Sequence, residues 1–250
     1  MKIVAIIPVR MAATRFPGKP LATILGLPMV EHVRRRLLLS QYLDEVIVAT
    51  CDNEIMDLVR QQGGKVVHTK DTYERCTDRV AEAASTLDAD VIINVQGDEP
   101  LVMPEMMKQV TRPLIDNKEL DCANLVAKIV DHNEFNDSNV PKLVGNIAGE
   151  LLYISREPIP STKKTITDDY LKLKQLGIIA FRKDFLQIFS KLKPTPLELV
   201  ESVDMMRAVE HGYRVKLVET KHQMIGVDVP SDVQRVEEVL SSDPLINKYI

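Results

Sequence analysis

The stretch from Ile6 to Lys19 reads I-I-P-V-R-M-A-A-T-R-F-P-G-K and is the strongest guide to the fold. Its apolar run is broken by Pro8, and the cations Arg10, Arg15 and Lys19 follow in an irregular segment. In an open α/β sheet, ligands bind where the carboxyl ends of the strands meet loops and helix N-termini. Arginine and lysine in such a loop suit phosphate oxygens. The stretch therefore predicts an α/β fold that holds a nucleotide polyphosphate after its first strand.

This loop differs from the two common glycine-rich phosphate loops. The chain has neither the GxxxxGK pattern of a Walker loop nor a GxGxxG dinucleotide fingerprint after the first strand. A nicotinamide dehydrogenase is therefore disfavoured. A solvated basic loop remains the structural alternative, although Gly18 would allow the backbone to approach a ligand closely.

The composition is that of a globular protein. In an acidic protein, a local cluster of cations more often serves a small anionic ligand. The chain has 250 residues, of which 45% are apolar and 27% charged, and its formal net charge is −4. A nucleic-acid partner is not expected, because such proteins usually carry a basic stripe. No apolar run approaches the roughly 20 residues of a membrane helix, and the three cysteines lack metal-ligand spacing. We expect a cytoplasmic protein without membrane insertion.

Short apolar runs alternate with amphipathic segments of helical length, which indicates a mostly parallel sheet with crossover helices. Strands are expected at Ile3–Ile7, Glu45–Ala49, Val66–His68, Val91–Val95 and Cys122–Val126. Helices are expected at Met29–Leu39, Asn53–Gln61, Asp78–Thr86 and Pro104–Pro113, with Gly63 and Gly64 ending the second of them.

The pattern changes beyond about residue 130. There we expect a hairpin of Lys142–Asn146 and Leu151–Ile154, a polar stretch over 155–169, a strand at Gly177–Phe181, a helix from Lys183, a helix over Glu198–His211, a strand at Val215–Val218 and a last helix from Ser231. We interpret residues 1–250 as a single domain. Residues ~130–180 would form an inserted lobe, suited to a second substrate site or a dimer surface.

A second chemical signal is the string N-V-Q-G-D-E-P, which begins at Asn94 and ends the apolar strand before it. A carboxylate at the carboxyl end of a strand, beside a phosphate loop, is well placed for Mg²⁺, which prefers one or two carboxylates together with substrate phosphates. Asp98 is that carboxylate, and Gln96 could read a base or a sugar. The structural alternative is a simple β-turn around Gly97.

A third signal is the string G-V-D-V-P-S-D, from Gly226 to Asp232, before the last expected helix. Asp232 or Ser231 could cap that helix. Asp228 lies too far upstream to be the cap and remains available as a second carboxylate. Two carboxylates and three phosphate-facing cations fit group transfer at a phosphorus centre.

Taken together, these strings resemble the 3-deoxy-manno-octulosonate cytidylyltransferases, or CMP-Kdo synthetases, over essentially the whole chain. The matches are I-P-x-R-x-x-x-T-R-F-P-G-K-P-L from Ile7, N-V-Q-G-D-E-P from Asn94, Tyr153-Ile154-Ser155-Arg156 with Pro158-Ile159-Pro160, Pro196-Leu197-Glu198 with Glu201, and Gly226-Val227-Asp228. The resemblance implies a three-layer, Rossmann-like nucleotide-diphospho-sugar transferase fold with a mostly parallel mixed sheet and an inserted lobe.

The resemblance also implies roles for individual residues. The nucleotide would be bound by Pro8, Arg10, Arg15, Lys19, Thr77, Gln96 and Asp98. The acceptor would be bound by Gln96, Arg156, Gln175, Glu198, Glu201 and Asp228. Mg²⁺ would be held by Asp98 and Asp228, and the catalytic set would be Arg10, Lys19, Asp98 and Asp228.

The reaction implied is attack by the anomeric hydroxyl of a 2-keto-3-deoxy sugar acid on the α-phosphorus of CTP. Pyrophosphate leaves, and a CMP-sugar forms for lipopolysaccharide or another surface glycan. The resemblance further implies a homodimer. The residues alone do not distinguish CTP from UTP. A non-catalytic nucleotide-binding homologue is disfavoured, because binding does not require two carboxylates placed for a metal.

The chain departs from the family pattern at three places. Arg75-Cys76-Thr77-Asp78-Arg79 stands where the family usually shows S-G-T-D-R, and Cys51 stands where an Asp is common. The string from Gln175, Q-L-G-I-I-A-F-R, replaces H-x-G-I-Y-x-Y-R, so an imidazole and two phenols are missing. Unpaired buried polar groups discriminate strongly between substrates. Two interpretations follow: a different acceptor, such as an amino-Kdo, another ulosonic acid or a phosphonate, or neutral drift with compensation elsewhere.

Overall fold

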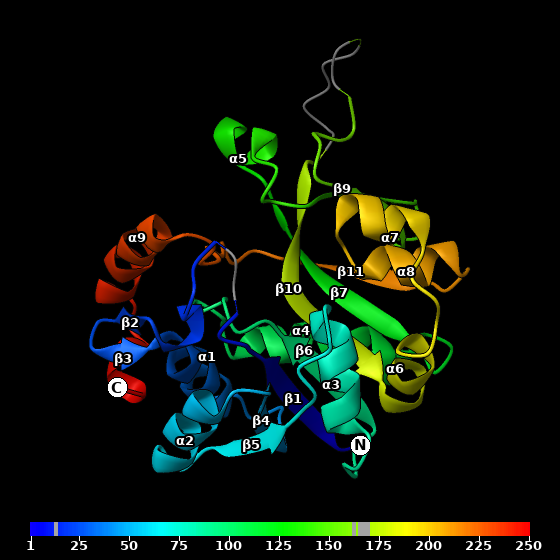
Figure 1. The fold of residues 1–250 in the computed structure, drawn as a ribbon. Helices are drawn as coiled ribbons and strands as arrows, with labels where there is room; N and C mark the ends of the chain where they lie inside the picture. Colours follow the sequence, from blue (N-terminus) through cyan, green and yellow to red (C-terminus); the bar gives the residue numbers. More distant parts are fainter. Residues whose placement is uncertain (13–14, 162–163, 165–170) are drawn as a thin grey trace. The chain divides into compact units, whose positions relative to one another are not determined.

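The computed structural model describes residues 1–12, 15–161, 164 and 171–250, and the chain divides into two compact units. Unit 1 comprises Met1–Lys108 and Met224–Ile250, and unit 2 comprises Gln109–Gln223. Figure 1 shows the helices and strands of both units, most of them with the labels used below. The expected lobe of residues ~130–180 falls within unit 2, and part of its polar stretch over 155–169 lies outside the described residues.

Unit 1 is built on parallel strands in the order β6-β1-β4-β5. These strands are β1 (Ile3–Pro8), β4 (Glu45–Thr50), β5 (Lys65–His68) and β6 (Val91–Val95). Every residue of β1 and β6 is buried. A parallel strand that is covered on both faces needs an unbroken apolar run, which is why the sequence predicts these strands so closely.

The other elements of unit 1 are mostly helical. They are η1 (Lys19–Leu21), β2 (Thr23–Ile24), β3 (Leu27–Pro28), α1 (Met29–Leu38), α2 (Asn53–Gln61), α3 (Cys76–Ala84), α9 (Pro230–Ser241) and η2 (Ile246–Lys248). Helix α4 (Glu105–Asp116) contains the boundary with unit 2. Within the described residues, no helix is both long and apolar enough to cross a membrane.

The predicted glycine pair ends α2. Gly63 adopts φ +68°, and the amide of Gly64 donates to the carbonyl of Val59 at 2.8 Å. A Cβ atom at Gly64 would lie 2.6 Å from Val59 Cγ1 and 2.9 Å from Arg34 Nε. Glycine is therefore required both for the left-handed turn and for the close approach that follows it.

Unit 2 contains a mixed sheet in the order β11-β7-β10-β8-β9. Strand β7 (Cys122–Lys128) pairs parallel with β11 (Val215–Thr220) and antiparallel with β10 (Leu173–Arg182). The predicted hairpin is confirmed as β8 (Lys142–Gly145) and β9 (Leu151–Ser155), which pair antiparallel. The helices are α5 (His132–Asn136), α6 (Lys183–Phe189), α7 (Pro196–Glu201) and α8 (Met205–Glu210).

Two helix predictions are wrong in extent. The single helix expected over Glu198–His211 is broken into α7 and α8 by Ser202, whose φ of 53° and ψ of 45° lie in the left-handed region. The apolar spacing continues across this break, so periodicity does not reveal it. Helix α4 also continues past Pro113 to Asp116, because a proline removes one amide donor without always ending a helix.

A buried ion pair joins α7 to α8. The guanidinium of Arg207 donates to both carboxylate oxygens of Glu198, at 2.6 and 2.8 Å. Both residues are nearly inaccessible to solvent, with exposures of 3% and 0%. Such a pair contributes little relative to an apolar pair, but removing one partner leaves a buried charge uncompensated.

We therefore expect Arg207→Met to lower the free energy of unfolding by about 3–5 kcal/mol. The matched control is Arg214→Met, which removes an exposed partner of Glu150 at 3.4 Å and should cost less than about 1 kcal/mol. Urea denaturation followed by circular dichroism measures both changes. Equal losses in the two variants would contradict the assignment of Glu198 to this internal pair.

Candidate functional site

A cavity of about 280 Å³ in unit 1 gathers residues from all three strings that the sequence singles out. The predicted nucleotide, acceptor and metal residues in its wall are Pro8, Arg10, Arg15, Lys19, Gln96, Asp98 and Asp228. Most of the wall residues lie at or just after the ends of β1 and β6, or just before or at the start of α3 and before α9. The carboxyl ends of neighbouring parallel strands lie at one edge of a sheet, and this brings the strings together.

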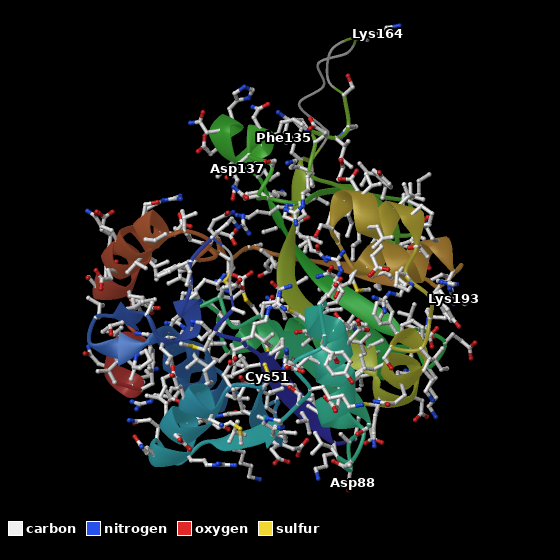
Figure 2. All side chains as sticks on the ribbon, in the orientation of Figure 1. Cys51, Asp88, Phe135, Asp137, Lys164 and Lys193 are labelled. Atoms are coloured by element: carbon white, nitrogen blue, oxygen red, sulfur yellow. The ribbon has the colours of Figure 1, made fainter. Side chains whose placement is uncertain are left out.

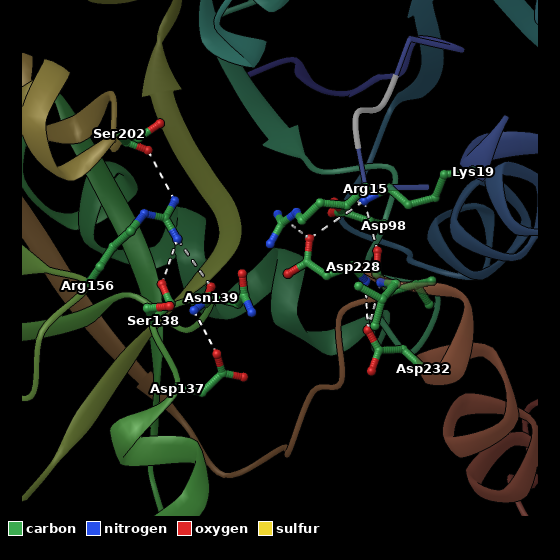
Figure 3. Close-up of polar contacts among 12 residues, drawn as sticks. Arg15, Lys19, Asp98, Asp137, Ser138, Asn139, Arg156, Ser202, Asp228 and Asp232 are labelled. Atoms are coloured by element: carbon green, nitrogen blue, oxygen red, sulfur yellow. Dashed lines mark hydrogen bonds and ion pairs between the residues drawn. The ribbon is translucent and has the colours of Figure 1, made fainter. Parts of the chain in front are cut away.

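Lys19 is the centre of the charged cluster in this cavity. Its Nζ donates to Asp98 Oδ2 at 2.7 Å and to the carbonyl of Val227 at 2.8 Å, and it lies 3.9 Å from Asp228 Oδ1. Arg15 Nη2 donates to the same oxygen of Asp228 at 2.8 Å. Figure 3 shows these contacts among Arg15, Lys19, Asp98 and Asp228. Two cations and two carboxylates are therefore interleaved at one point.

The backbone around the cluster is held independently of these side chains. The amide of Val227 donates to the carbonyl of Asp98 at 2.9 Å, which links the turn after β6 to the segment before α9. At Gly97, a Cβ atom would lie only 2.2 Å from Val9 Cγ1. Glycine therefore allows the turn carrying Asp98 to pass against the loop after β1.

The electrostatics of Asp228 suit a divalent cation. Burial raises the pKa of Asp228, and the charge of Asp98 raises it further, against the opposing effects of Lys19 and Arg15. A carboxylate whose ionised form is disfavoured by burial and by a neighbouring carboxylate gains from a nearby counter-ion. Among the described residues, no group of three or more His, Cys, Asp or Glu is positioned to hold a metal. The carboxylates of Asp98 and Asp228 are the kind of ligands that suit Mg²⁺, which commonly takes one or two carboxylates and completes its shell with phosphates and water.

The raised pKa of Asp228 has a consequence for stability. The folded state binds the proton of this carboxyl more tightly than the unfolded state, so stability falls as pH rises from the ordinary Asp value through the raised pKa, and the loss persists above it. We therefore expect Asp228→Asn, without ligands at neutral pH, to melt at the same or a higher temperature than the wild type. A lower melting temperature would contradict this account.

The matched control for that measurement is Asp232→Asn. The Asp232 carboxylate accepts hydrogen bonds from the amides of Asp228 and Val229, at 2.9 and 3.0 Å. It thereby satisfies donors at the start of α9, which bears out the expectation that Asp232 could cap this helix. Its replacement by Asn removes a negative charge from the N-terminus of α9, which should destabilise the protein by about 0.3–1 kcal/mol and lower the melting temperature.

Other predicted nucleotide residues are held by the segment around α3. Arg10 Nη1 donates to the carbonyl of Tyr73 at 3.3 Å. Thr77 is fully buried, and its Oγ1 accepts from Asn94 Nδ2 at 3.3 Å. In this structure Thr77 therefore contributes to the packing of α3 on β6, whereas Arg10 and Gln96 are part of the cavity wall.

Two departures from the family pattern also line the cavity. Arg75 and Cys76 lie in its wall, which follows from their place at the start of α3. Cys51, another departure from the family pattern (Figure 2), is half-buried after β4, and its Sγ donates to Asp52 Oδ2 at 3.6 Å. Asp52 also accepts from the amide of Met11 at 2.8 Å. It helps to position the loop after β1, although its sequence context shows only a residue ahead of a helix.

The predicted acceptor residues of unit 2 have partners inside that unit. The guanidinium of Arg156 donates to the backbone carbonyls of Glu201 at 2.8 Å, Ser138 at 3.0 Å and Ser202 at 3.3 Å. Figure 3 shows Arg156 reaching Ser138, Asn139 and Ser202. Arg156 thus joins the segment before β8 to the end of α7.

The carboxylate of Glu201 also has hydrogen-bond partners inside unit 2. It accepts from Tyr153 Oη at 2.8 Å, Ser155 Oγ at 3.0 Å and the amide of Arg156 at 2.8 Å. Burial by itself would raise the pKa of Glu201, but these hydrogen bonds outweigh burial and leave the pKa lowered. The ionised carboxylate is therefore the stable form, and it anchors the end of β9 to α7.

Gln175 and Glu198 also have internal partners. Gln175 Nε2 donates to Asn124 Oδ1 at 2.7 Å, beside the irregularity where β10 loses register with β7. Glu198 is the buried partner of Arg207 described above. The structure therefore brings together the predicted nucleotide and metal residues of unit 1, and it shows the predicted acceptor residues of unit 2 in intramolecular contacts.

Comparisons with known proteins find relatives that match nearly the whole chain. Residues 4–220 match the cytidylyltransferase family model. The 3-deoxy-manno-octulosonate cytidylyltransferase of Geobacter metallireducens is 44% identical, over 96% of this chain and 98% of that protein. Among solved structures, a CMP:2-keto-3-deoxy-manno-octonic acid synthetase complexed with CTP is 34% identical, with a TM-score of 0.89 over 96% of this chain and 99% of the other.

The fold itself extends to more distant enzymes. The 4-diphosphocytidyl-2C-methyl-D-erythritol synthase of Anaerococcus prevotii is 16% identical, with a TM-score of 0.64 over 96% of this chain and 98% of the other. At this identity the likeness concerns the fold alone. The mixed, mostly parallel sheet expected from the sequence is confirmed by both structural relatives.

Proposed function

The chain belongs to the 3-deoxy-manno-octulosonate cytidylyltransferase family, and from this premise we propose that it transfers CMP from CTP to Kdo, a 2-keto-3-deoxy sugar acid, with release of pyrophosphate. The product would serve lipopolysaccharide or related surface-glycan synthesis. The observation that carries the proposal is the cluster at Lys19, in which Asp98 and Asp228 meet the cations of the loop after β1.

The proposed chemistry is a direct displacement. A bond forms between the anomeric oxygen of the acceptor and the α-phosphorus of CTP, the bond from that phosphorus to the bridging oxygen breaks, and pyrophosphate leaves with the electron pair. The anomeric hydroxyl loses its proton to solvent water. Such a transfer depends mainly on alignment and on neutralisation of the phosphate charges, and it needs no covalent enzyme intermediate.

The residues of the cluster supply that neutralisation. Arg10, Arg15 and Lys19 would bind the triphosphate and the leaving pyrophosphate. Asp98 and Asp228 would hold Mg²⁺, which when bound supplies additional positive charge at the phosphates. In the structure Arg15 is paired with Asp228 and Lys19 with Asp98. We propose that substrate binding exchanges those ion pairs for contacts to phosphate.

The acceptor side of the proposal rests on family membership and on resemblance. Gln96 in unit 1 lines the cavity. Arg156, Gln175, Glu198 and Glu201 are engaged within unit 2. We propose that these four residues of unit 2 position the segments that bind the acceptor. Direct contact with the acceptor would come from Gln96 and Asp228.

A panel assay tests both the nucleotide and the acceptor. Pyrophosphate release is measured with ATP, GTP, CTP and UTP against Kdo, amino-substituted Kdo, other ulosonic acids and phosphonates. We expect CTP with Kdo to give the highest kcat/KM. A tenfold preference for another acid would favour the alternative acceptor, for which the cavity-lining Arg75 and Cys76 are the structural reason. Absence of release with every acceptor would overturn the proposal.

The proposal includes a cytoplasmic setting and a homodimer. Cys51, Cys76 and Cys122 are free thiols, a state that a reducing compartment maintains. The homodimer is carried over from the resemblance alone. Sedimentation equilibrium tests it, with twice the chain mass expected and a concentration-independent monomer contradicting it.

A further inference from the structure

Arg79 is a buried cation in the wall of the nucleotide cavity. It lies on α3, with only 3% of its surface exposed, and it belongs to the same cavity wall as Arg10, Lys19 and Gln96. Its Nη1 is anchored at the end of β5, where it donates to Thr69 Oγ1 at 2.5 Å and to the carbonyl of Lys70 at 3.2 Å. The guanidinium is thus held in a defined orientation.

The second terminal nitrogen of Arg79, Nη2, is buried and has no hydrogen-bond acceptor among the described residues. No described carboxylate forms an ion pair with this guanidinium, in contrast to Arg15 and Lys19 in the same wall. Buried guanidinium groups almost always find acceptors, and a buried charge without a counter-charge is costly. Arg79 Nη2 therefore requires an acceptor from outside the described residues, and its place in a cavity wall makes a bound molecule a natural source of that acceptor.

We propose that Arg79 is a nucleotide-binding residue, whose Nη2 donates to an oxygen acceptor of the nucleotide held in this cavity. The inference rests on the proposed function. A cytidine nucleotide offers two kinds of such oxygen, the carbonyl of the base and the phosphate oxygens. Glu74 and Cys76 line the same wall and are exposed. A rotamer change in such side chains on ligand binding is ordinary.

A purely structural role would not need Nη2. The link between α3 and the end of β5 is made by Nη1, and the amide of Thr69 is separately held by the carbonyl of Thr50 at 2.9 Å. A structural role and a ligand-binding role therefore depend on different atoms of one side chain. Variants that affect these atoms separately distinguish the two roles.

The test is the affinity of Arg79→Lys for CTP, cytidine and pyrophosphate, each measured separately by isothermal titration calorimetry. Lysine keeps the positive charge and can still reach Thr69, but it lacks the second terminal nitrogen of the guanidinium group. We expect CTP and one of the two fragments to bind about 10- to 100-fold more weakly, as for a lost hydrogen bond to a charged group. Loss for cytidine assigns the acceptor to the nucleoside, and loss for pyrophosphate assigns it to the phosphates. Unchanged affinity for all three probes overturns the inference.

Two control variants distinguish the loss of a ligand contact from a change in the folded structure. Thr69→Val removes the anchor of Nη1 but leaves Nη2 in place, so a loss as large as that of Arg79→Lys would indicate a structural role and overturn the inference. Arg34→Lys changes another buried arginine of unit 1, whose fork is paired with Glu31 at 2.7 and 2.6 Å, and it should leave all three affinities unchanged. If the wild type itself binds none of the probes, the proposed function fails, whereas wild-type binding with an unaffected Arg79→Lys rejects only the role of Arg79.

Discussion

Replacing Asp98 by Asn should lower kcat for pyrophosphate release by about a thousandfold or more, in the range found when a charge-stabilising group is removed from an active site. Asp98 Oδ2 lies 2.7 Å from Lys19 Nζ, and its carboxylate faces that of Asp228 across this ammonium group. Asparagine keeps the shape of the side chain but removes the charge that a divalent cation requires.

The fold of the Asp98→Asn variant should be retained. The carbonyl of Asp98 accepts from the amide of Val227, and that backbone contact does not involve the side chain. The variant should therefore still bind CTP in the absence of metal, which separates loss of catalysis from loss of the site. A suitable control is Asp90→Asn, which alters an exposed carboxylate that accepts from the amide of Lys2 and should stay within about twofold of the wild type. Retention of a tenth of wild-type activity by Asp98→Asn would contradict the role of Asp98 in the cluster.

Replacing Lys19 by Met should lower kcat/KM for CTP by about 10²- to 10³-fold. The Nζ of Lys19 contacts Asp98, the carbonyl of Val227 and, at 3.9 Å, Asp228. Its removal takes positive charge from the proposed triphosphate site and leaves two carboxylates facing each other without the cation between them. Initial rates over a range of CTP concentrations separate the effect on kcat from that on KM.

Lys19→Arg provides a sharper comparison. It keeps the charge, but a planar fork does not replace a compact ammonium group that reaches three acceptors at once. We expect partial activity, well below that of the wild type. As a control, Lys65→Met removes an exposed lysine paired with Glu45 at 2.7 Å and should leave the rate unchanged. A Lys19→Met variant within tenfold of the wild type would show that the cluster does not carry the reaction.

Much of unit 1 is predictable from the sequence because its strands are buried on both faces. The strand predicted at Val91–Val95 has the same bounds as β6, and Ile3–Ile7 differs from β1 only by Pro8. The convergence of Asp98 and Asp228 on Lys19 is also predictable in outline, since loops that follow parallel strands meet at one edge of the sheet.

Other features depend on contacts that the linear sequence does not reveal. The break between α7 and α8 comes from the left-handed conformation of Ser202, while the apolar spacing runs on without interruption. The partners of Gln175 and Glu201 lie 51 and 48 positions away, at Asn124 and Tyr153. A polar side chain in a family motif therefore looks the same in sequence whether it faces a ligand or a neighbouring strand.

Arg79 shows that a candidate ligand-binding residue can also go unrecognised in the sequence. In the sequence it is one charged residue of a helix that begins at Cys76. Only the structure shows that its Nη1 is anchored, that it is buried in a cavity wall, and that its Nη2 lacks a partner among the described residues. Burial and hydrogen-bond satisfaction, rather than residue type, single it out.

The most direct test of the proposed function is a single reaction of the purified protein with CTP, Kdo and Mg²⁺, followed by phosphorus NMR. The account predicts one pyrophosphate for each CMP-linked sugar formed, with no turnover when Kdo or Mg²⁺ is withheld. Release of phosphate or pyrophosphate from CTP at the same rate without Kdo, or no reaction in the complete mixture, would contradict it.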